Sequence, residues 1–188
     1  MIPIFGIAHS LTTMKTSELT SADYHSYYQP YIDAVGEAEL MELMQNQLVN
    51  FPHFMESIPE TLWQHSYGLG KWTIAEVLLH VIDAERVFQY RALRIARKDL
   101  TPLAGFDQEA YVPNSGANER SRESIIEEYK AVRGASISLF KTFKREQLLL
   151  HGTASKAQVS VGALGFLICG HQKHHRNVIR ERYLISQS

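Results

Sequence analysis

Residues 70–99, GKWTIAEVLLHVIDAERVFQYRALRIARKD, decide the fold class. Apolar residues recur every three or four positions in this stretch, which is the spacing of one face of an α-helix. We expect the helix to begin near Trp72 or Thr73, after the break at Gly70. It should end near Arg97, where basic side chains interact favourably with the helix dipole. A helix this long with one apolar face needs partners to cover that face.

Three further helices follow from the same spacing, over residues 37–58, 121–143 and 160–184. In the first of these, Pro52 predicts a kink or an early end because proline lacks a backbone donor. Ser160 is a suitable N-cap for the last one. No strand pattern competes with these helices. The sequence therefore predicts an all-α protein, an antiparallel four-helix bundle.

The segments between the helices are expected to differ in role. Residues 99–121 are rich in Pro, Gly and Asn and predict a long crossover loop, a type of segment that is often functional. Residues 153–161 have the character of a short extended piece, but nothing in the sequence offers it a partner. We expect residues 37–188 to form one bundle domain and residues 1–36 an N-terminal arm, with a short helix or ordered loop over residues 21–34.

The composition excludes several classes of function. The 19 basic and 20 acidic side chains give a formal net charge of −1, which argues against nucleic acid as a partner. The single cysteine, Cys169, excludes an intrachain disulfide and a multi-cysteine zinc cluster. No stretch approaches the roughly 20 apolar residues of a membrane-spanning helix, and no secretory signal is recognisable. We therefore expect a cytoplasmic protein without a membrane partner.

Residues 170–176, GHQKHHR, hold three histidines in the last predicted helix. Because an α-helix turns about 100° per residue, His171 and His175 fall on its apolar stripe, whereas His174 lies roughly 80° away. The first two should point into the bundle. They lie about 6 Å apart along the axis, so both imidazoles can reach one metal ion.

A third ligand is available on the helix of residues 72–97. His80 lies there among Val77, Val81 and Ala84 on the predicted buried side. His80, His171 and His175 thus form a candidate metal site with open positions for water or substrate. The alternative for His80 taken alone is a core histidine satisfied by a hydrogen bond. His174 is expected at the edge of the bundle, as a surface contact or a proton carrier.

Charged residues near His80 are candidates for supporting roles. Asp83 or Glu85 would orient an imidazole or accept a proton, and Arg91 would bind an anionic group of the substrate. The alternative for each is a solvated charge or a surface ion pair. Trp72, together with loop residues in the crossover, is placed to cover a metal ion; the loop candidates are Asp107 and Tyr111.

The motifs GKWTIAEVLLHVIDAERVFQYRALRIARKD, TPLAGFDQEAYV and GHQKHHRNVIRERY together resemble the DinB-like superfamily, in particular its YfiT-type branch. The resemblance covers about residues 37–184. It implies up-down-down-up helix connectivity, a homodimer, and a divalent metal held by His80, His171 and His175. We expect Zn²⁺ or Ni²⁺ first and Fe²⁺ after them, because imidazole suits all three.

The resemblance implies two kinds of activity on a small-molecule substrate. One is metal-dependent hydrolysis, and the other is transfer of a low-molecular-weight thiol onto an electrophile. Both need the same three-histidine site, because a metal lowers the pKa of water and of a thiol alike. The alternative is a stress-response module that binds a metal or a small ligand without catalysis.

Overall fold

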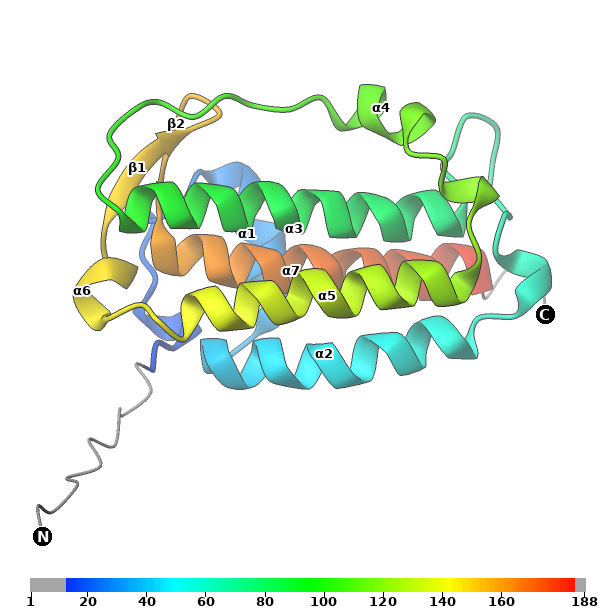
Figure 1. Ribbon diagram of the computed structural model, residues 1–188, viewed down its shortest axis with the longest axis horizontal. Coiled ribbons are helices and arrows are strands. Elements are labelled where there is room, and N and C mark those ends of the chain that lie inside the picture. Colours follow the sequence, from blue (N-terminus) through cyan, green and yellow to red (C-terminus); the bar gives the residue numbers. More distant parts are fainter. Residues whose placement is uncertain (1–12, 185–188) are drawn as a thin grey trace, which may run out of the picture.

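The computed structural model describes residues 13–184 of the chain. Four long helices lie side by side in a bundle (Figure 1). They are α2 (Leu40–Ser57), α3 (Ile74–Ala96), α5 (Arg122–Phe140) and α7 (Val161–Val178). In Figure 1, α2 and α7 run in one direction and α3 and α5 in the other, so the connectivity is up-down-down-up. The predicted four-helix bundle with a long crossover is confirmed.

The beginnings of the helices are fixed by side-chain caps, which is why the sequence located them well. Thr73 Oγ1 accepts a hydrogen bond from the backbone of Glu76, and the Glu76 carboxylate accepts one from Thr73 N. Ser121 and Ser160 are the N-cap residues of α5 and α7, and each side chain accepts a hydrogen bond from the backbone N–H three residues further on. Each cap satisfies a backbone donor that the first helical turn leaves without a partner.

The later parts of α2 and α7 extend about as far as predicted, to Ser57 and Leu184. Of the two alternatives that Pro52 predicts, the early end is wrong, because α2 continues past the proline. Phe51 and Met55 on either side of the proline are fully buried, and this packing offsets the lost hydrogen bond. The last helix is α-helical only to Val178 and continues as a π-helical segment, η6 (Ile179–Leu184).

Residues 151–160 form a β-hairpin, which corrects the expectation that the extended piece has no partner. Strand β1 (His151–Ala154) pairs antiparallel with β2 (Ala157–Ser160). The sequence concealed the turn because its central residues, Ser155 and Lys156, adopt positive φ angles of 50° and 66° without a glycine. The short helix α6 (Arg145–Leu148) links α5 to this hairpin.

The crossover between α3 and α5 passes over the bundle and is tied down at both ends (Figure 1). At one end, Leu103 exchanges backbone hydrogen bonds with Thr153 and Ser155 of the hairpin region. At the other, the side chain of Asn118 bonds to Thr73 and Glu76 at the start of α3. The crossover contains α4 (Gln108–Tyr111), η4 (Val112–Asn114) and η5 (Ala117–Glu119). These anchors hold α4 above the bundle.

The N-terminal segment packs on the outside of α7. It contains η1 (Thr16–Glu18), η2 (Ser26–Tyr28) and α1 (Gln29–Val35), and η3 (Glu60–Leu62) follows α2. The two helices α1 and α7 meet at Gly170, where an added Cβ would lie 2.2 Å from the carbonyl oxygen of Tyr31. The expected short helix within residues 21–34 is therefore present as η2 and α1.

The boundary between arm and bundle at residue 37 stays a prediction. Residues 1–12 of the expected arm and residues 185–188 of the expected bundle domain lie outside the described residues. None of the helices between residues 13 and 184 combines the length and apolar character that crossing a lipid bilayer requires.

Candidate metal centre

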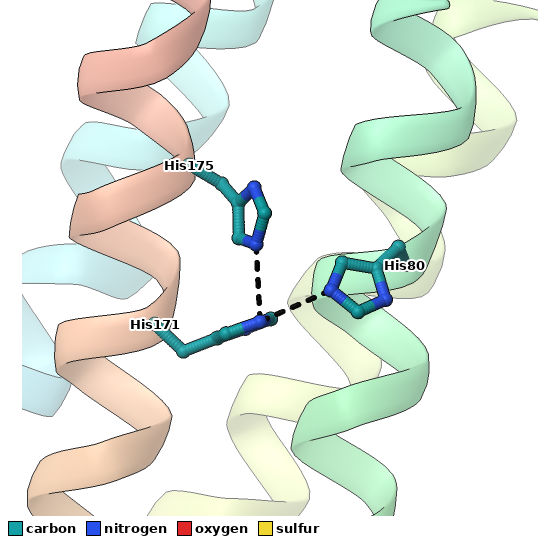
Figure 2. A group of neighbouring side chains, drawn as sticks. All are labelled: His80, His171 and His175. Atoms are coloured by element: carbon teal, nitrogen blue, oxygen red, sulfur yellow. Dashed lines mark hydrogen bonds between the residues drawn. The ribbon is translucent and has the colours of Figure 1, made fainter. Parts of the chain in front are cut away.

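The imidazoles of His80, His171 and His175 meet between α3 and α7 (Figure 2). His80 lies in the second turn of α3, and the other two lie one turn apart on α7. His171 Nε2 is 3.1 Å from His80 Nε2 and 3.1 Å from His175 Nε2. The structure thus brings together the three histidines selected from the sequence.

Hydrogen bonds alone explain this cluster poorly. A ring nitrogen carries either a hydrogen or a lone pair, so His171 Nε2 cannot donate to one neighbour while accepting from the other. Three nitrogens that bind one ion at about 2.0 to 2.1 Å lie about 2.9 Å apart at right angles and about 3.3 Å apart at the tetrahedral angle. The two spacings around His171, 3.1 Å each, fall between these values, and all three ligand nitrogens lie within 4.8 Å of one another. The donor set therefore fits a single divalent cation.

Burial keeps the three rings in the form that binds metals. His80 and His171 are each 5% exposed. Burial lowers the pKa of His80 to about 4, and it holds the pKa values of His171 and His175 well below their ordinary range. The neighbouring imidazoles lower the last two further. The rings are thus neutral near pH 7, with lone pairs available to a cation.

Aromatic side chains surround the cluster. The Trp72 ring lies 4.9 Å from that of His80, and the Phe88 ring 6.1 Å from that of His171. From α1, the Tyr31 ring packs edge-on against His171 at 5.3 Å. Tyr31 was not predicted as a site residue, because nothing in the spacing of residues 21–34 places them near the histidines. The only available signal was the density of tyrosines in that segment.

His174 lies at the edge of the site, as its position on the helix predicted. Its ring contacts those of Tyr31 and His175, at 5.1 Å and 5.0 Å. It is half-buried, and burial lowers its pKa. His174 therefore borders the cluster without joining the group of converging nitrogens.

Two hollows border the histidines, and α4 contributes to the walls of both. The first has a volume of about 370 Å³ and includes His80 and His171, with Tyr27, Tyr28, Tyr31 and Phe88 among its walls. The second has a volume of about 410 Å³ and includes His174 and His175. Gln108 and Glu109 line both hollows. The crossover thus places polar side chains over the cluster, between two routes of access.

The other candidate residues have partners of their own. Asp83 forms an ion pair with Arg86, and Glu85 accepts two hydrogen bonds from buried Arg133. Arg91 Nη2 donates to Ala104 O and Ser155 Oγ, at 2.9 Å and 2.8 Å. These contacts give Arg91 a role in holding the crossover against the hairpin. None of the contacts found for the three residues within the described chain reaches an imidazole of the cluster.

The loop candidates are divided between the site and the surface. Asp107 lines the first hollow, but its carboxylate is engaged as the N-cap of α4, where Oδ1 accepts from the backbone of Glu109 and Ala110. The Tyr111 ring packs on Phe106 at 5.5 Å and is about half exposed. Cys169 is buried behind the site, and burial raises the pKa of its thiol to about 12.

The fold and the cluster define a four-helix bundle with a three-histidine centre between two of its helices. The family model of the DinB superfamily matches residues 43–179, and the chain belongs to this superfamily. The motifs quoted from the sequence lie largely within the matched region. The resemblance inferred from those motifs is confirmed.

Among solved structures, the chain is similar to YfiT from Bacillus subtilis, which is described as a probable metal-dependent hydrolase with an unusual four-helix bundle topology. The TM-score is 0.67 at 16% sequence identity, over 89% of this chain and 92% of that chain. At that identity the similarity establishes the fold, whereas activity depends on the site. No curated protein matches the sequence.

Proposed function

We propose that this protein is a metal-dependent enzyme that holds one divalent ion through His80, His171 and His175. The observation that carries the proposal is the convergence of three neutral imidazoles, those of buried His80 and His171 and of half-buried His175, with 3.1 Å between the nitrogens in two of the contacts. Membership of the DinB superfamily and the description of YfiT support it. Zn²⁺ and Ni²⁺ are the ions we expect first, and Fe²⁺ next.

His80, His171 and His175 would hold the ion, which when bound would act as a Lewis acid and lower the pKa of water or of a low-molecular-weight thiol. The protein's own residues then bind a small-molecule substrate and accept or donate protons during its reaction. The first hollow borders two of the three histidines and has aromatic walls, so we assign the substrate to it.

Glu109 is the carboxylate that we assign as the proton acceptor. It lines both hollows, and unlike Asp107 it is not engaged as a helix cap. A carboxylate near the reacting group can take the proton released by water or by a thiol. Glu109 lies in α4 of the crossover, outside the two helices that carry the histidines.

The experiment that tests the proposed function compares two panels of reactions with metal-reconstituted protein. One panel holds ester and amide substrates, and the other pairs low-molecular-weight thiols with electrophiles. Turnover that requires the metal in either panel supports an enzyme and identifies its class. Persistent inactivity at full metal occupancy contradicts it and favours a non-catalytic module that binds a metal or a small ligand. Homodimerisation and a cytoplasmic location stay predictions.

A further inference from the structure

A layer of polar side chains crosses the interior of the bundle and joins all four long helices. At its centre, Arg133 of α5 is fully buried, and its partner Glu85 of α3 is 2% exposed. The remaining members are also buried: Gln47 of α2, Ser136 of α5 and Gln172 of α7. The layer lies between two separate clusters of apolar core residues.

The guanidinium of Arg133 bonds to three other helices at once. Its Nε and Nη2 donate to the two carboxylate oxygens of Glu85, at 2.8 Å and 2.9 Å. Its Nη1 donates to Gln47 Oε1 at 2.7 Å, and Nη2 reaches Gln172 Oε1 at 3.3 Å. Ser136 Oγ donates to Glu85 Oε1 at 2.7 Å. The planar, bidentate geometry fixes both distance and orientation between α5 and α3.

The α7 side of the layer is held by additional bonds. Tyr129 Oη lies 3.1 Å from Gln172 Oε1. Gln47 Nε2 donates to the backbone oxygen of Cys169 at 3.0 Å. These bonds fix α7 at residues 169 and 172, on either side of the first histidine of the pair.

Stability alone does not account for such a layer. Replacing a buried ion pair by apolar residues of similar volume is often neutral or stabilising, because desolvation of the charges opposes their attraction. Buried polar groups have a better attested use in fixing the register of packed helices. The position of this layer indicates that the register it fixes is that of α3 on α7, the two helices that carry the histidines.

The layer lies next to the histidines along both helices that carry them. Glu85 follows His80 by five residues on α3, and Gln172 is adjacent to His171 on α7. A shift of α3 by one residue would move His80 by about 1.5 Å along the axis. That displacement is large beside the bond of about 2.0 to 2.1 Å between an imidazole and a metal ion.

We propose that Arg133 and Glu85 are positioning residues for the metal centre. Through Gln172, they fix the axial register of α3 on α7 so that three imidazole nitrogens meet at one point. This inference rests on the proposed function, because it assigns the layer to the geometry of the same site. It predicts that metal binding and stability respond differently when the layer becomes apolar.

The test uses Co²⁺ as the probe and the full chain carrying Glu85→Leu with Arg133→Met. We expect a urea unfolding midpoint equal to or above that of the wild type in the metal-free state. We also expect a Kd for Co²⁺ at least tenfold weaker, with an altered visible absorption spectrum, as for other residues that orient metal ligands. The matched control is Arg86→Gln with Glu128→Gln, which removes a 2.5 Å ion pair between α3 and α5 nearer the surface. This control should keep the wild-type spectrum and Kd.

The outcomes separate the inference from the proposed function. If the double variant binds Co²⁺ with the wild-type Kd and spectrum, the positioning role is wrong even though the metal site stands. If the wild type itself binds no Co²⁺, the proposed function is wrong, and the positioning role that rests on it is wrong as well. Should the double variant not fold, Gln172→Met decides, since it removes the bonds to α7 that pass through residue 172 and leaves the pair of Arg133 and Glu85 in place. A weaker Kd with an altered spectrum then supports the positioning role, and unchanged values overturn it.

Discussion

His80 Nε2 and His171 Nε2 lie 3.1 Å apart, although 91 residues separate them in the chain. The contact exists because α3 and α7 pack directly against each other and each presents a histidine at the same level. His175 joins them from the next turn of α7. The histidine cluster is therefore a property of the bundle, and no isolated helix could form it.

Removing one converging imidazole should abolish metal binding. We expect His171→Ala to carry less than a tenth of the wild-type metal after reconstitution and desalting, because two nitrogens remain where three are needed. His174→Ala is the matched control, since His174 borders the cluster without joining it. Elemental analysis of both variants checks this. Equal metal loss in the two variants would contradict the assignment of ligands.

The contact between α1 and α7 should depend on the absence of a side chain at position 170. Gly170→Ala places a Cβ 2.2 Å from Tyr31 O, so we expect a loss of about 1 to 3 kcal/mol in the free energy of unfolding. Gly134→Ala in α5 meets nothing within 4 Å and should stabilise the protein by about 0.5 to 1 kcal/mol. Urea unfolding measures both. A gain in stability for Gly170→Ala would show that α1 does not pack closely there.

Asp23 should make the attachment of the N-terminal segment depend on pH. Burial opposes ionisation, but hydrogen bonds from Thr20 outweigh it and lower the pKa of Asp23 below 3.8. A carboxyl whose pKa is lower in the folded state stabilises the protein above the unfolded value and loses that effect as pH falls through the folded value. The imidazole of His151 also lies 3.2 Å from the Asp23 carboxylate, so both proteins are compared with His151 replaced by Gln. In that background the stability difference between Asp23 and Asp23→Asn should be constant from pH 7 to 5 and shrink towards pH 3. Urea midpoints at these pH values test this, and a difference that grows on acidification would contradict it.

Replacing the assigned proton acceptor should reduce turnover without releasing the metal. For Glu109→Gln we expect a drop of about 10²-fold or more in kcat at unchanged metal content, because the amide cannot accept the proton. Glu119→Gln, in η5 of the same crossover, is the control and should keep full activity. Steady-state kinetics with the substrate found by the reaction panels provides the measurement. Wild-type kcat in Glu109→Gln would remove this residue from the mechanism.

The parts of the fold that the sequence predicted are those governed by local chemistry. Thr73, Ser121 and Ser160 cap their helices through bonds to residues three positions away, so the start of each helix is visible locally. The pair of histidines on α7 is likewise a matter of helical spacing. His80 completed the site because its own helix had a clear apolar face.

The parts that escaped prediction depend on contacts between distant segments. Pro52 remains helical because core residues hold α2 on both sides of it. The hairpin turn at Ser155 and Lys156 carries no glycine to reveal it. Tyr31 reaches His171 only through the docking of α1 at Gly170, and Arg133 and Glu85 lie 48 residues apart. No spacing within one helix encodes these relationships.

X-ray absorption spectroscopy of the zinc- or nickel-reconstituted protein is the decisive test of the three-histidine site, because it reports the ligands of the bound ion. We expect about one ion per chain, with three imidazole nitrogens at about 2.0 to 2.1 Å in the zinc form. A spectrum that requires fewer than three imidazoles, or protein that retains no ion after reconstitution, would contradict it.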